Sequence, residues 1–482
     1  MKKLLLILLL IPLLSLAQEK VLVDNLINKG TADVPLMYYL NHLFSGVSFD
    51  VYIDGSISNE TDYYLGRRHG VSNDYYQEGN LKNTIVFENN FANGIEKKLN
   101  KSKQVIFIQT WVNGTIHGLA KSYFDSGIVK NQGFLIEGGL RQDVWDYFTE
   151  KGVMKFKGNY NFDVLNGTAK SYFEDGKIKE DVTYVDGKLD GLFKIHYENG
   201  KVKEDGKYKY YETLNKSIKD GKFKEFHDNG QLKSVGEFIY GQYGNTRDGE
   251  HKEFHENGIQ KSKGVYTRGS KNGVFQEWYS NSNLSYQENW VYKETYKGGL
   301  DLGAYEQKYG ICSYYYENGK LRLEENWENA SLNGLSTSYY ENGQVAKKVT
   351  YSNNDIHGIT EEWYENGKLK FAGEFLLNNG YSIKKGVHKQ FFSSGKLHTE
   401  YNHDYRGDVS EFIEFYENGQ KKIEGFEPHR RYISWTSEGV FDVSRWHGDL
   451  IRSEAEYQNK KAAYTEEMNS PSPFDLFMQD QN

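Results

Sequence analysis

Apolar and polar residues alternate with a period of two in short runs along this chain, and the runs are interrupted by Asn-Gly or related turn signals. Around Asn199-Gly200, the two flanking runs place aromatic and aliphatic side chains on one face and lysines such as Lys194 and Lys203 on the other. This period is that of a half-buried β-strand, and Asn-Gly between two such runs is a strong hairpin signal. The pattern predicts a hairpin with a two-residue type I′ turn.

The hairpin signal recurs. Tyr-Glu-Asn-Gly-Lys occurs at 197–201, 316–320 and 364–368, and looser copies place the turn glycine at Gly55, Gly79, Gly127, Gly152, Gly176, Gly230, Gly258, Gly343, Gly395, Gly419 and Gly439. Most neighbouring copies are 24 residues apart, with degenerate tips at Lys103 and Ser282, and a second glycine precedes most tips by nine residues. About sixteen such units fill residues 46–440.

A two-residue turn at Gly200 also predicts the cross-strand pairs of its hairpin. The expected pairs are Glu198 with Lys201, Tyr197 with Val202, Phe193 with Gly206 and Gly191 with Tyr208; the same columns pair Tyr364 with Leu369 and Gly358 with Phe375. Successive hairpins should extend one sheet with no covering layer. The expected fold is all-β: an elongated single-layer antiparallel sheet of tandem hairpins with a short C-terminal helix.

The two ends of the chain differ from the repeats. Lys2 and Lys3, the apolar run that follows and Ser15-Leu16-Ala17 predict a secretory signal peptide over residues 1–17, and hence export to the periplasm, the cell surface or the medium. Residues 18–45 are expected to supply a capping strand at 36–40. Residues 441–482 should form a helical cap, with the helix at 448–468, and a loose tail.

Composition narrows the function classes. Aromatics reach 15% with 39 Tyr and 49 Gly, a bias typical of short strands packed by rings. The net charge of −8 is spread along the chain, which argues against nucleic acid as a partner. The single Cys312 excludes an internal disulfide and a cysteine zinc site. Phosphate-binding, nucleophile-elbow and His-Glu-x-x-His motifs are absent, so we expect no enzyme activity, no cofactor and no metal site.

Three regular features have both a structural and a functional interpretation. His196, His227 and His255 occupy aromatic columns and are interpreted as packing residues. The acidic residues before the turns form a ladder, which we interpret as pairing with lysines across each hairpin, with calcium binding as the alternative. The aromatic columns are interpreted as structural, with sugar stacking as the alternative.

Departures from the repeat point to a binding surface. The connection at the end opposite to the tip is normally six residues long, but it is lengthened at 209–220, 239–248, 291–309 and 376–385. All four should project from one edge of the sheet, where repeat proteins commonly bind partners. The candidate binding residues are Tyr210, Tyr211, Tyr240, Tyr243, Tyr292, Tyr296, Tyr305 and Tyr381. Neutral drift of exposed loops is an equally good interpretation.

The unit Gly-x4-aromatic-aromatic-Glu-Asn-Gly-Lys-Leu-Lys, closed by Tyr-x-x-Gly, resembles the MORN-repeat variant family over 46–440. The resemblance implies hairpin sheets that serve as scaffolds or binding modules, and one bacterial branch is named as toxin–antitoxin antitoxins. We expect an exported, non-catalytic scaffold for an unknown protein partner, or for a glycan. The alternatives are an antitoxin or immunity protein and a scaffold at a membrane surface; no transmembrane segment is expected in the mature chain.

Overall fold

The computed structural model describes residues 19–241, 244–297, 300–426, 431–446, 449–451 and 453–469. These residues divide into two units. Unit 1 comprises residues up to Gly230 together with Tyr240–Asn245, and unit 2 comprises Gln231–Ile239 and the residues from Thr246 onward. The predicted signal peptide, residues 1–17, lies outside the described residues. Each unit is described by itself below.

Unit 1 consists of strands and three single-turn helices. Its elements are β1 (Lys20–Leu22), η1 (Val23–Asn25), β2 (Ile27–Asn28), β3 (Met37–Tyr39), β4 (His42–Leu43), β5 (Gly46–Val51), β6 (Ile57–Tyr64), β7 (Arg67–Tyr75), β8 (Leu81–Glu88), β9 (Phe91–Ala92), β10 (Gly94–Leu99), β11 (Val105–Val112), β12 (Thr115–Tyr123), β13 (Val129–Ile136), η2 (Glu137–Gly139), β14 (Leu140–Phe148), β15 (Met154–Asn161), β16 (Val164–Tyr172), β17 (Ile178–Val185), β18 (Lys188–His196), β19 (Val202–Tyr211), η3 (Glu212–Leu214), β20 (Lys216–Lys219) and β21 (Gly221–Phe226).

Strands β22 (Leu232–Gly241) and β23 (Gly244–Phe254) contribute residues to both units. The remaining elements belong to unit 2. They are β24 (Gln260–Thr267), β25 (Ser270–Lys271), β26 (Gly273–Trp278), β27 (Leu284–Lys297), β28 (Leu300–Lys308), β29 (Gly310–Tyr315), β30 (Leu321–Glu328), β31 (Ser331–Leu332), β32 (Gly334–Tyr339), β33 (Val345–Ser352), β34 (Asp355–Trp363), β35 (Leu369–Asn378), β36 (Tyr381–Phe391), β37 (Leu397–His403), β38 (Val409–Phe415), β39 (Lys421–Phe426), β40 (Arg431–Trp435), β41 (Phe441–Trp446), β42 (Asp449–Ile451) and helix α2 (Glu454–Asn469).

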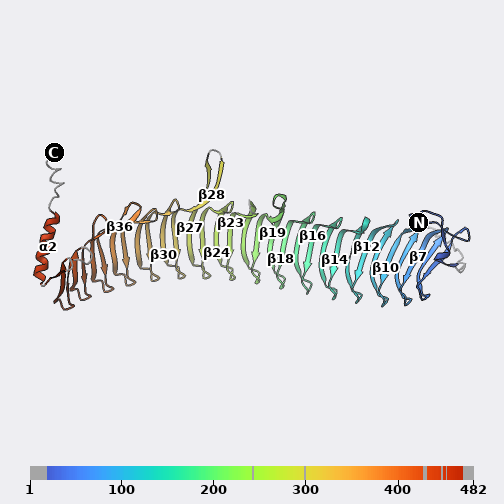
Figure 1. Cartoon of the computed structure of the whole chain (residues 1–482), viewed down its shortest axis with the longest axis horizontal. Helices are drawn as coiled ribbons and strands as arrows, with labels where there is room; N and C mark the ends of the chain where they lie inside the picture. Colours follow the sequence, from blue (N-terminus) through green and yellow to red (C-terminus); the bar gives the residue numbers. More distant parts are fainter. Residues whose placement is uncertain are drawn as a thin grey trace, which may run out of the picture. The chain divides into compact units, whose positions relative to one another are not determined.

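The predicted fold class is confirmed: the protein is an all-β, open and mostly antiparallel sheet of hairpins with one short C-terminal helix. Within each unit, successive strands lie side by side in chain order in a single layer (Figure 1). The register of the hairpin bodies is as predicted, because Gly191 pairs with Tyr208, Phe193 with Gly206 and Gly358 with Phe375.

The predicted type I′ turn is wrong. At the tip of hairpin β18–β19, the Gly200 amide donates to the Tyr197 carbonyl and the Tyr197 amide donates to the Lys201 carbonyl. Gly200 has a φ of 86° whereas Asn199 is not among the residues with positive φ, so the loop has three residues and its glycine is left-handed. Tyr197 therefore lies opposite Lys201, and Val202 pairs with His196 instead of Tyr197.

One irregularity restores the expected register beyond the turn. A β-bulge between Ile195 and His196 adds a residue on β19, which offsets the one-residue shift at the tip. The same arrangement pairs Trp363, and not Tyr364, with Leu369. The degenerate tips follow the same geometry, since Lys103 and Ser282 have φ values of 64° and 73°.

The tip residues bond to the next hairpin. Tyr340 Oη donates to the Trp363 carbonyl at 2.7 Å, and Asn342 Nδ2 donates to the Glu365 carbonyl at 3.1 Å. Equivalent Tyr bonds join tips in both units, and His255 replaces Tyr in one of them. The tip lysine also reaches forward: Lys201 Nζ contacts the Asn229 carbonyl at 2.5 Å, and the predicted pair between Lys201 and Glu198 does not form. The tip motif thus connects neighbouring repeats.

The core is a column of side chains down the middle of one face of the sheet, which we call the inner face. In this column glycines alternate with rings, and a Cβ added at Gly206 would lie 2.2 Å from the ring of Phe223. Trp145 and His388 lie in the same way over Gly133 and Gly373. Close ring-to-backbone packing takes the place of a second layer.

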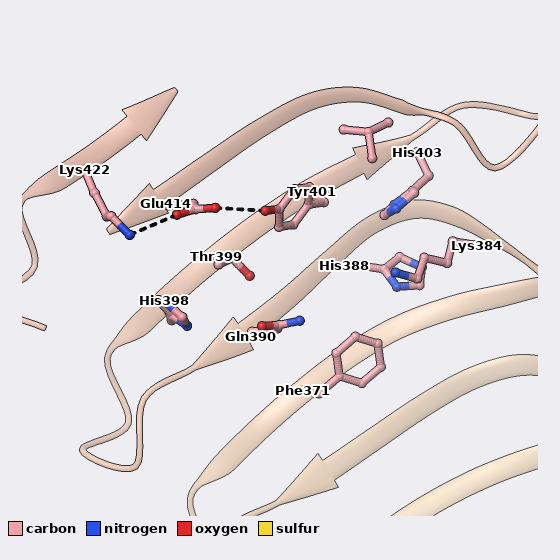
Figure 2. Close-up of a pocket in the computed structure, with 11 residues that line it drawn as sticks. Phe371, Lys384, His388, Gln390, His398, Thr399, Tyr401, His403, Glu414 and Lys422 are labelled. Carbon is pink, nitrogen blue, oxygen red and sulfur yellow. Dashed lines mark hydrogen bonds and ion pairs between the residues drawn. The ribbon is translucent and has the colours of Figure 1, made fainter. Parts of the chain in front are cut away.

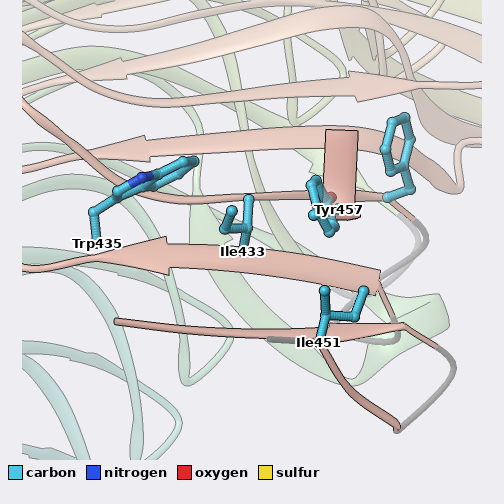
Figure 3. Close-up of a cluster of buried hydrophobic side chains, with 5 residues drawn as sticks. Ile433, Trp435, Ile451 and Tyr457 are labelled. Atoms are coloured by element: carbon cyan, nitrogen blue, oxygen red, sulfur yellow. The ribbon is translucent and has the colours of Figure 1, made fainter. Parts of the chain in front are cut away.

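The ends differ in detail from the expected caps. Residues 37–39 form β3 of a small separate sheet with β2 and β4, and the strand that extends the main sheet is β1, parallel to β5. At the other end, Asp449–Ile451 is strand β42, and α2 begins only at Glu454. Tyr457 of α2 is fully buried against Phe426, Ile433, Trp435 and Ile451 (Figure 3).

Candidate functional site

The lengthened connections lie at the edge of the sheet away from the tips. In unit 1 the insertion at 209–220 consists of the end of β19, η3 and β20. Tyr211 stacks on Tyr240 from the neighbouring insertion, with ring centroids 4.4 Å apart and an angle of 18° between the planes. The Tyr240 hydroxyl lies 3.2 Å from Thr213 Oγ1, and 42% of Tyr240 is exposed. These two predicted residues form one exposed stack.

Two other predicted residues of unit 1 lie apart from this stack or cannot be placed. The Tyr210 hydroxyl donates to Asn215 Oδ1 at 2.6 Å, within its own loop, and the Lys188 ammonium lies 5.1 Å from the Tyr210 ring centroid. Tyr210 therefore stabilises the loop from inside. Tyr243 lies outside the described residues.

The largest departure from the repeat is hairpin β27–β28 of unit 2, which extends past the edge of the sheet (Figure 1). Its strands pair from Trp290 with Lys308 to Lys297 with Leu300. An isolated two-stranded hairpin is marginally stable in water, so the way in which its base is held matters.

A buried ion pair fixes the base of this hairpin. Lys308 Nζ lies 2.6 Å from Glu288 Oε1, and the Tyr314 hydroxyl contacts both groups, at 2.9 Å from the lysine and 2.8 Å from the carboxylate. Burial alone would raise the pKa of Glu288, but the bonds from Lys308 and Tyr314 outweigh it and lower the pKa. Burial, with Glu288 beside it, raises the pKa of Tyr314 to about 12. Trp290 completes the shell, its Nε1 donating to Glu288 at 3.1 Å.

The preceding hairpin supports the side of the same stem. Arg268 forms an ion pair of 3.1 Å with Glu294, and the Lys271 amide donates to the Glu306 carboxylate. The Lys271 ammonium also lies 4.5 Å from the Trp290 ring centroid. The lower half of the hairpin is thus attached at several points, which reduces its freedom to bend.

The predicted tyrosines of unit 2 are distributed over both faces of this stem and one further insertion. Tyr292 lies opposite Glu306 and donates to Glu294 at 3.0 Å, whereas Tyr305 lies opposite Lys293 on the other face and is 48% exposed. Tyr296 pairs in register with Asp301 on the upper half. Tyr381 begins β36 and is 74% exposed. Tyr292, Tyr305 and Tyr381 therefore do not form one patch.

A second candidate site was not predicted from the sequence. Two adjoining hollows, of about 510 and 330 Å³, lie on the inner face of unit 2 and share Phe371, Gln390 and His398. We call them together the inner-face groove. Figure 2 shows the first hollow, with Lys384, His388, Thr399, Tyr401, His403, Glu414 and Lys422 around it. Thr360, Glu362, Lys347 and Lys370 are among the residues that line the second.

Two histidines of the groove belong to the packed column. The ring of His388 lies over Gly373 with its Nε2 2.7 Å from the Glu374 carbonyl, which matches Trp145, whose Nε1 donates to the Phe134 carbonyl at 2.9 Å. His403 packs on His388 with ring centroids 4.6 Å apart. Burial lowers the pKa of His388 and of His403, so both rings are neutral at pH 7. Their role in the groove is to form its wall.

The side chains at the two candidate sites are mainly polar and aromatic. Among the described residues, no three His, Cys, Asp or Glu side chains gather in a way that could hold a metal ion. In that same part of the chain, no helix is long and apolar enough to cross a bilayer. Cys312, the lone cysteine, is fully buried in the column, and burial raises its thiol pKa.

The groove escaped prediction because its residues are identified only by the register. Three histidines within sixteen positions, at 388, 398 and 403, are the one unusual signal in the sequence. The prediction of packing histidines named His196, His227 and His255 and did not include His388, which lies over Gly373. The hollows form where side chains from several paired strands meet, and the sequence alone does not place these side chains together.

Comparisons with known proteins address the repeat. The sequence model described as the MORN repeat variant matches residues 165–186, 189–210, 219–240, 247–267, 308–329, 332–353 and 356–376. Strand β27 and β28 up to Gln307 fall in the gap between the fourth and fifth matches. No curated protein matches this chain.

Solved structures of toxin complexes also align. They include a crystal structure of TcdB2-TccC3 without its hypervariable C-terminal region, at 11% identity and a TM-score of 0.14, covering 90% of this chain and 25% of that chain. A Photorhabdus luminescens Tc holotoxin pore aligns at 10% identity and a TM-score of 0.14, covering 88% of this chain and 25% of that one. This chain thus spans about a quarter of those chains. The matches from 165 to 376 show that the central hairpins of this chain are repeats of the MORN repeat variant family.

Proposed function

We propose that this protein is an exported, non-catalytic repeat scaffold that holds a protein partner at the insertion edge of its sheet, chiefly through hairpin β27–β28. The observation that carries the proposal is the stem of this hairpin. A segment that had lengthened by drift would need no buried carboxylate, and removing either partner of such a pair is costly. The Glu288–Lys308–Tyr314 cluster instead holds a projecting, tyrosine-bearing hairpin at a set position.

Several features suit a binding role for the hairpin. Tyrosine supplies a large contact area with few rotatable bonds, and Tyr305 is half exposed. The stem interactions limit the freedom that a partner would otherwise have to freeze on binding. The edges of a two-stranded hairpin also carry backbone groups that can pair with an added strand.

The structure dictates how the hairpin should be removed. Deleting 291–309 would also remove Lys308 and leave Glu288 buried without its cation, so the loss of binding would be confounded with loss of stability. Replacing residues 293–305 by Asn-Gly keeps Tyr292, Glu306, Gln307 and Lys308. This variant should melt within about 2 °C of the parent, because it keeps the Glu288–Lys308–Tyr314 cluster and loses the exposed Arg268–Glu294 ion pair, and exposed ion pairs contribute little to stability.

Partner capture tests the proposal. The full-length protein and the shortened variant are used as bait in envelope extracts, the captured protein is identified and purified, and its affinity for both baits is measured. We expect binding to be lost with the shortened hairpin and retained in Tyr405→Ala, a control at an exposed ring elsewhere in unit 2. Equal affinity of both baits would refute the role of the hairpin. A mature N-terminus at Gln18, found by mass spectrometry, would support export, and an intact Met1 would refute it.

A further inference from the structure

The inner-face groove carries an imbalance of charge. Glu362 is already paired, at 2.8 Å with Lys347 and 3.6 Å with Lys370, and Glu414 accepts from Tyr401 at 3.0 Å and lies 3.5 Å from Lys422. Lys384 lines the groove, and among the described residues no carboxylate lies within ion-pair distance of it. Four lysines and two glutamates leave a net charge of +2 on a chain whose total is −8.

The groove also contains hydroxyls that lack partners. Thr360 and Thr399 are 3% and 4% exposed, and their Oγ1 atoms have no hydrogen-bond partner in the described part of the protein. A buried hydroxyl without a partner is unfavourable, and a hydrogen bond from a bound molecule would remove this cost. These two threonines line different hollows, so each hollow contains one hydroxyl group without a hydrogen-bond partner.

The remaining lining alternates flat rings with polar groups. Phe371, Tyr401 and His398 line the groove, and the His398 ring packs on Phe392 with centroids 4.2 Å apart. Gln390 lies between the two hollows and lines both. Ring faces with adjacent amide and hydroxyl groups suit pyranose sugars, whose C–H faces pack on rings while their hydroxyls form hydrogen bonds.

We propose that the inner-face groove binds a segment of an acidic polysaccharide, with a uronate carboxylate on Lys384 and sugar faces on Phe371 and Tyr401. This site is separate from the hairpin and does not depend on the function proposed for it. A peptide strand is disfavoured because the backbone groups of a sheet interior are used in its own ladder and none are free on the face. Single-stranded nucleic acid needs a cation for most phosphates, and the groove offers a single unpaired lysine.

Titration calorimetry on the full-length protein tests this with three probes: hexagalacturonate, neutral maltohexaose and dT10. We expect hexagalacturonate to bind, and we expect neither maltohexaose nor dT10 to displace it. Lys384→Gln should weaken binding about tenfold, the loss of one charged hydrogen bond, and should reduce its salt dependence. Lys348→Gln, which lies outside the groove, should bind as the parent does.

Thr399→Val separates a binding role from a structural one. Valine keeps the shape and removes the hydroxyl that has no partner, so thermal stability should be unchanged or higher whereas affinity for hexagalacturonate falls about fivefold. The proposal would be overturned if the parent protein did not bind hexagalacturonate at millimolar concentration. It would also be overturned if Lys384→Gln and Thr399→Val both bound hexagalacturonate as tightly as the parent does. Equally tight binding of maltohexaose would overturn the acidic class, and displacement by dT10 would assign the groove to nucleic acid.

Discussion

Gly206 has backbone angles open to any residue, yet a Cβ at this position would lie 2.2 Å from the ring of Phe223. Gly133, Gly236, Gly264 and Gly373 meet rings in the same way. These glycines are needed because a side chain would overlap the ring that lies on them. The glycines at the tips are needed for a different reason, their positive φ, which is 86° at Gly200. In a sheet with one layer, the core at these positions is a ring that lies directly on the backbone of a glycine. There is no room between them for one additional methyl group.

Gly206→Ala should therefore destabilise unit 1 by about 1–3 kcal/mol through overpacking, measured by chemical denaturation. Combining it with Phe223→Leu, which shortens the opposing side chain, should cost less than the sum of the two single changes. Strictly additive losses would show that the two residues do not share this contact.

His388 predicts a pH dependence. Burial lowers its pKa in the folded state below the unfolded value of about 6.5, so the unfolded chain binds the proton more readily. The neutral His388 ring therefore contributes fully to the free energy of unfolding above a pH of about 6.5, and this contribution is lost as the pH falls below the unfolded pKa. His388→Trp copies Trp145 in the same packing environment, and should flatten the fall in urea midpoint between pH 7.5 and 5.5. An unchanged slope would assign the pH dependence to other groups, such as His251 or His403, whose pKa values burial also lowers.

At the scale of the hairpin, the tip motif has a different purpose from the one that its turn signal suggests. Asn342 Oδ1 accepts from the Gln344 amide at 2.8 Å while its Nδ2 donates to the Glu365 carbonyl of the next tip. Asparagine is thus required for its two-ended side chain, and only the glycine has positive φ. This explains why the motif includes tyrosine and lysine, which have no role in turn formation but also bond forward.

Asn342→Asp distinguishes the two explanations. Aspartate suits a type I′ turn as well as asparagine does, so a turn-forming role predicts little change. The observed ladder predicts a loss of about 1 kcal/mol, because aspartate keeps the acceptor and places a carboxylate against the Glu365 carbonyl. Thermal unfolding measures the difference, with the exposed Glu365→Ala as the control for loss of a tip side chain.

At the scale of the whole molecule, stability should be close to a sum of contacts between neighbouring repeats. Helix α2 exemplifies this. Tyr457 is completely buried on the last strands, its hydroxyl lies 3.4 Å from the Glu424 carbonyl, and Lys461 pairs with Glu424 at 2.6 Å. In the described part of the chain the helix packs on β39 to β42, so its loss should not be felt along the array.

Tyr457→Ala should cost about 3–5 kcal/mol, but locally. In hydrogen exchange, amides of β39 to β41 should lose protection while those of residues 165–376 keep theirs. Gln458→Ala, an exposed neighbour on the same helix, should change neither region. Loss of protection throughout the chain would show that the array unfolds as one cooperative unit.

The sequence by itself determined the hairpins, their number and spacing, and the pairing along their bodies, because these follow from a period of two and from turn residues that act locally. It also located the insertions by their length. Only the tertiary structure decided the turn type and the forward hydrogen bonds of Tyr340 and Asn342. At residues 195–203 the one-residue shift of register at the tip is cancelled by the β-bulge. The tertiary structure alone revealed the Glu288–Lys308 anchor and the inner-face groove, since these depend on side chains that meet across several strands, and no local pattern records such distances.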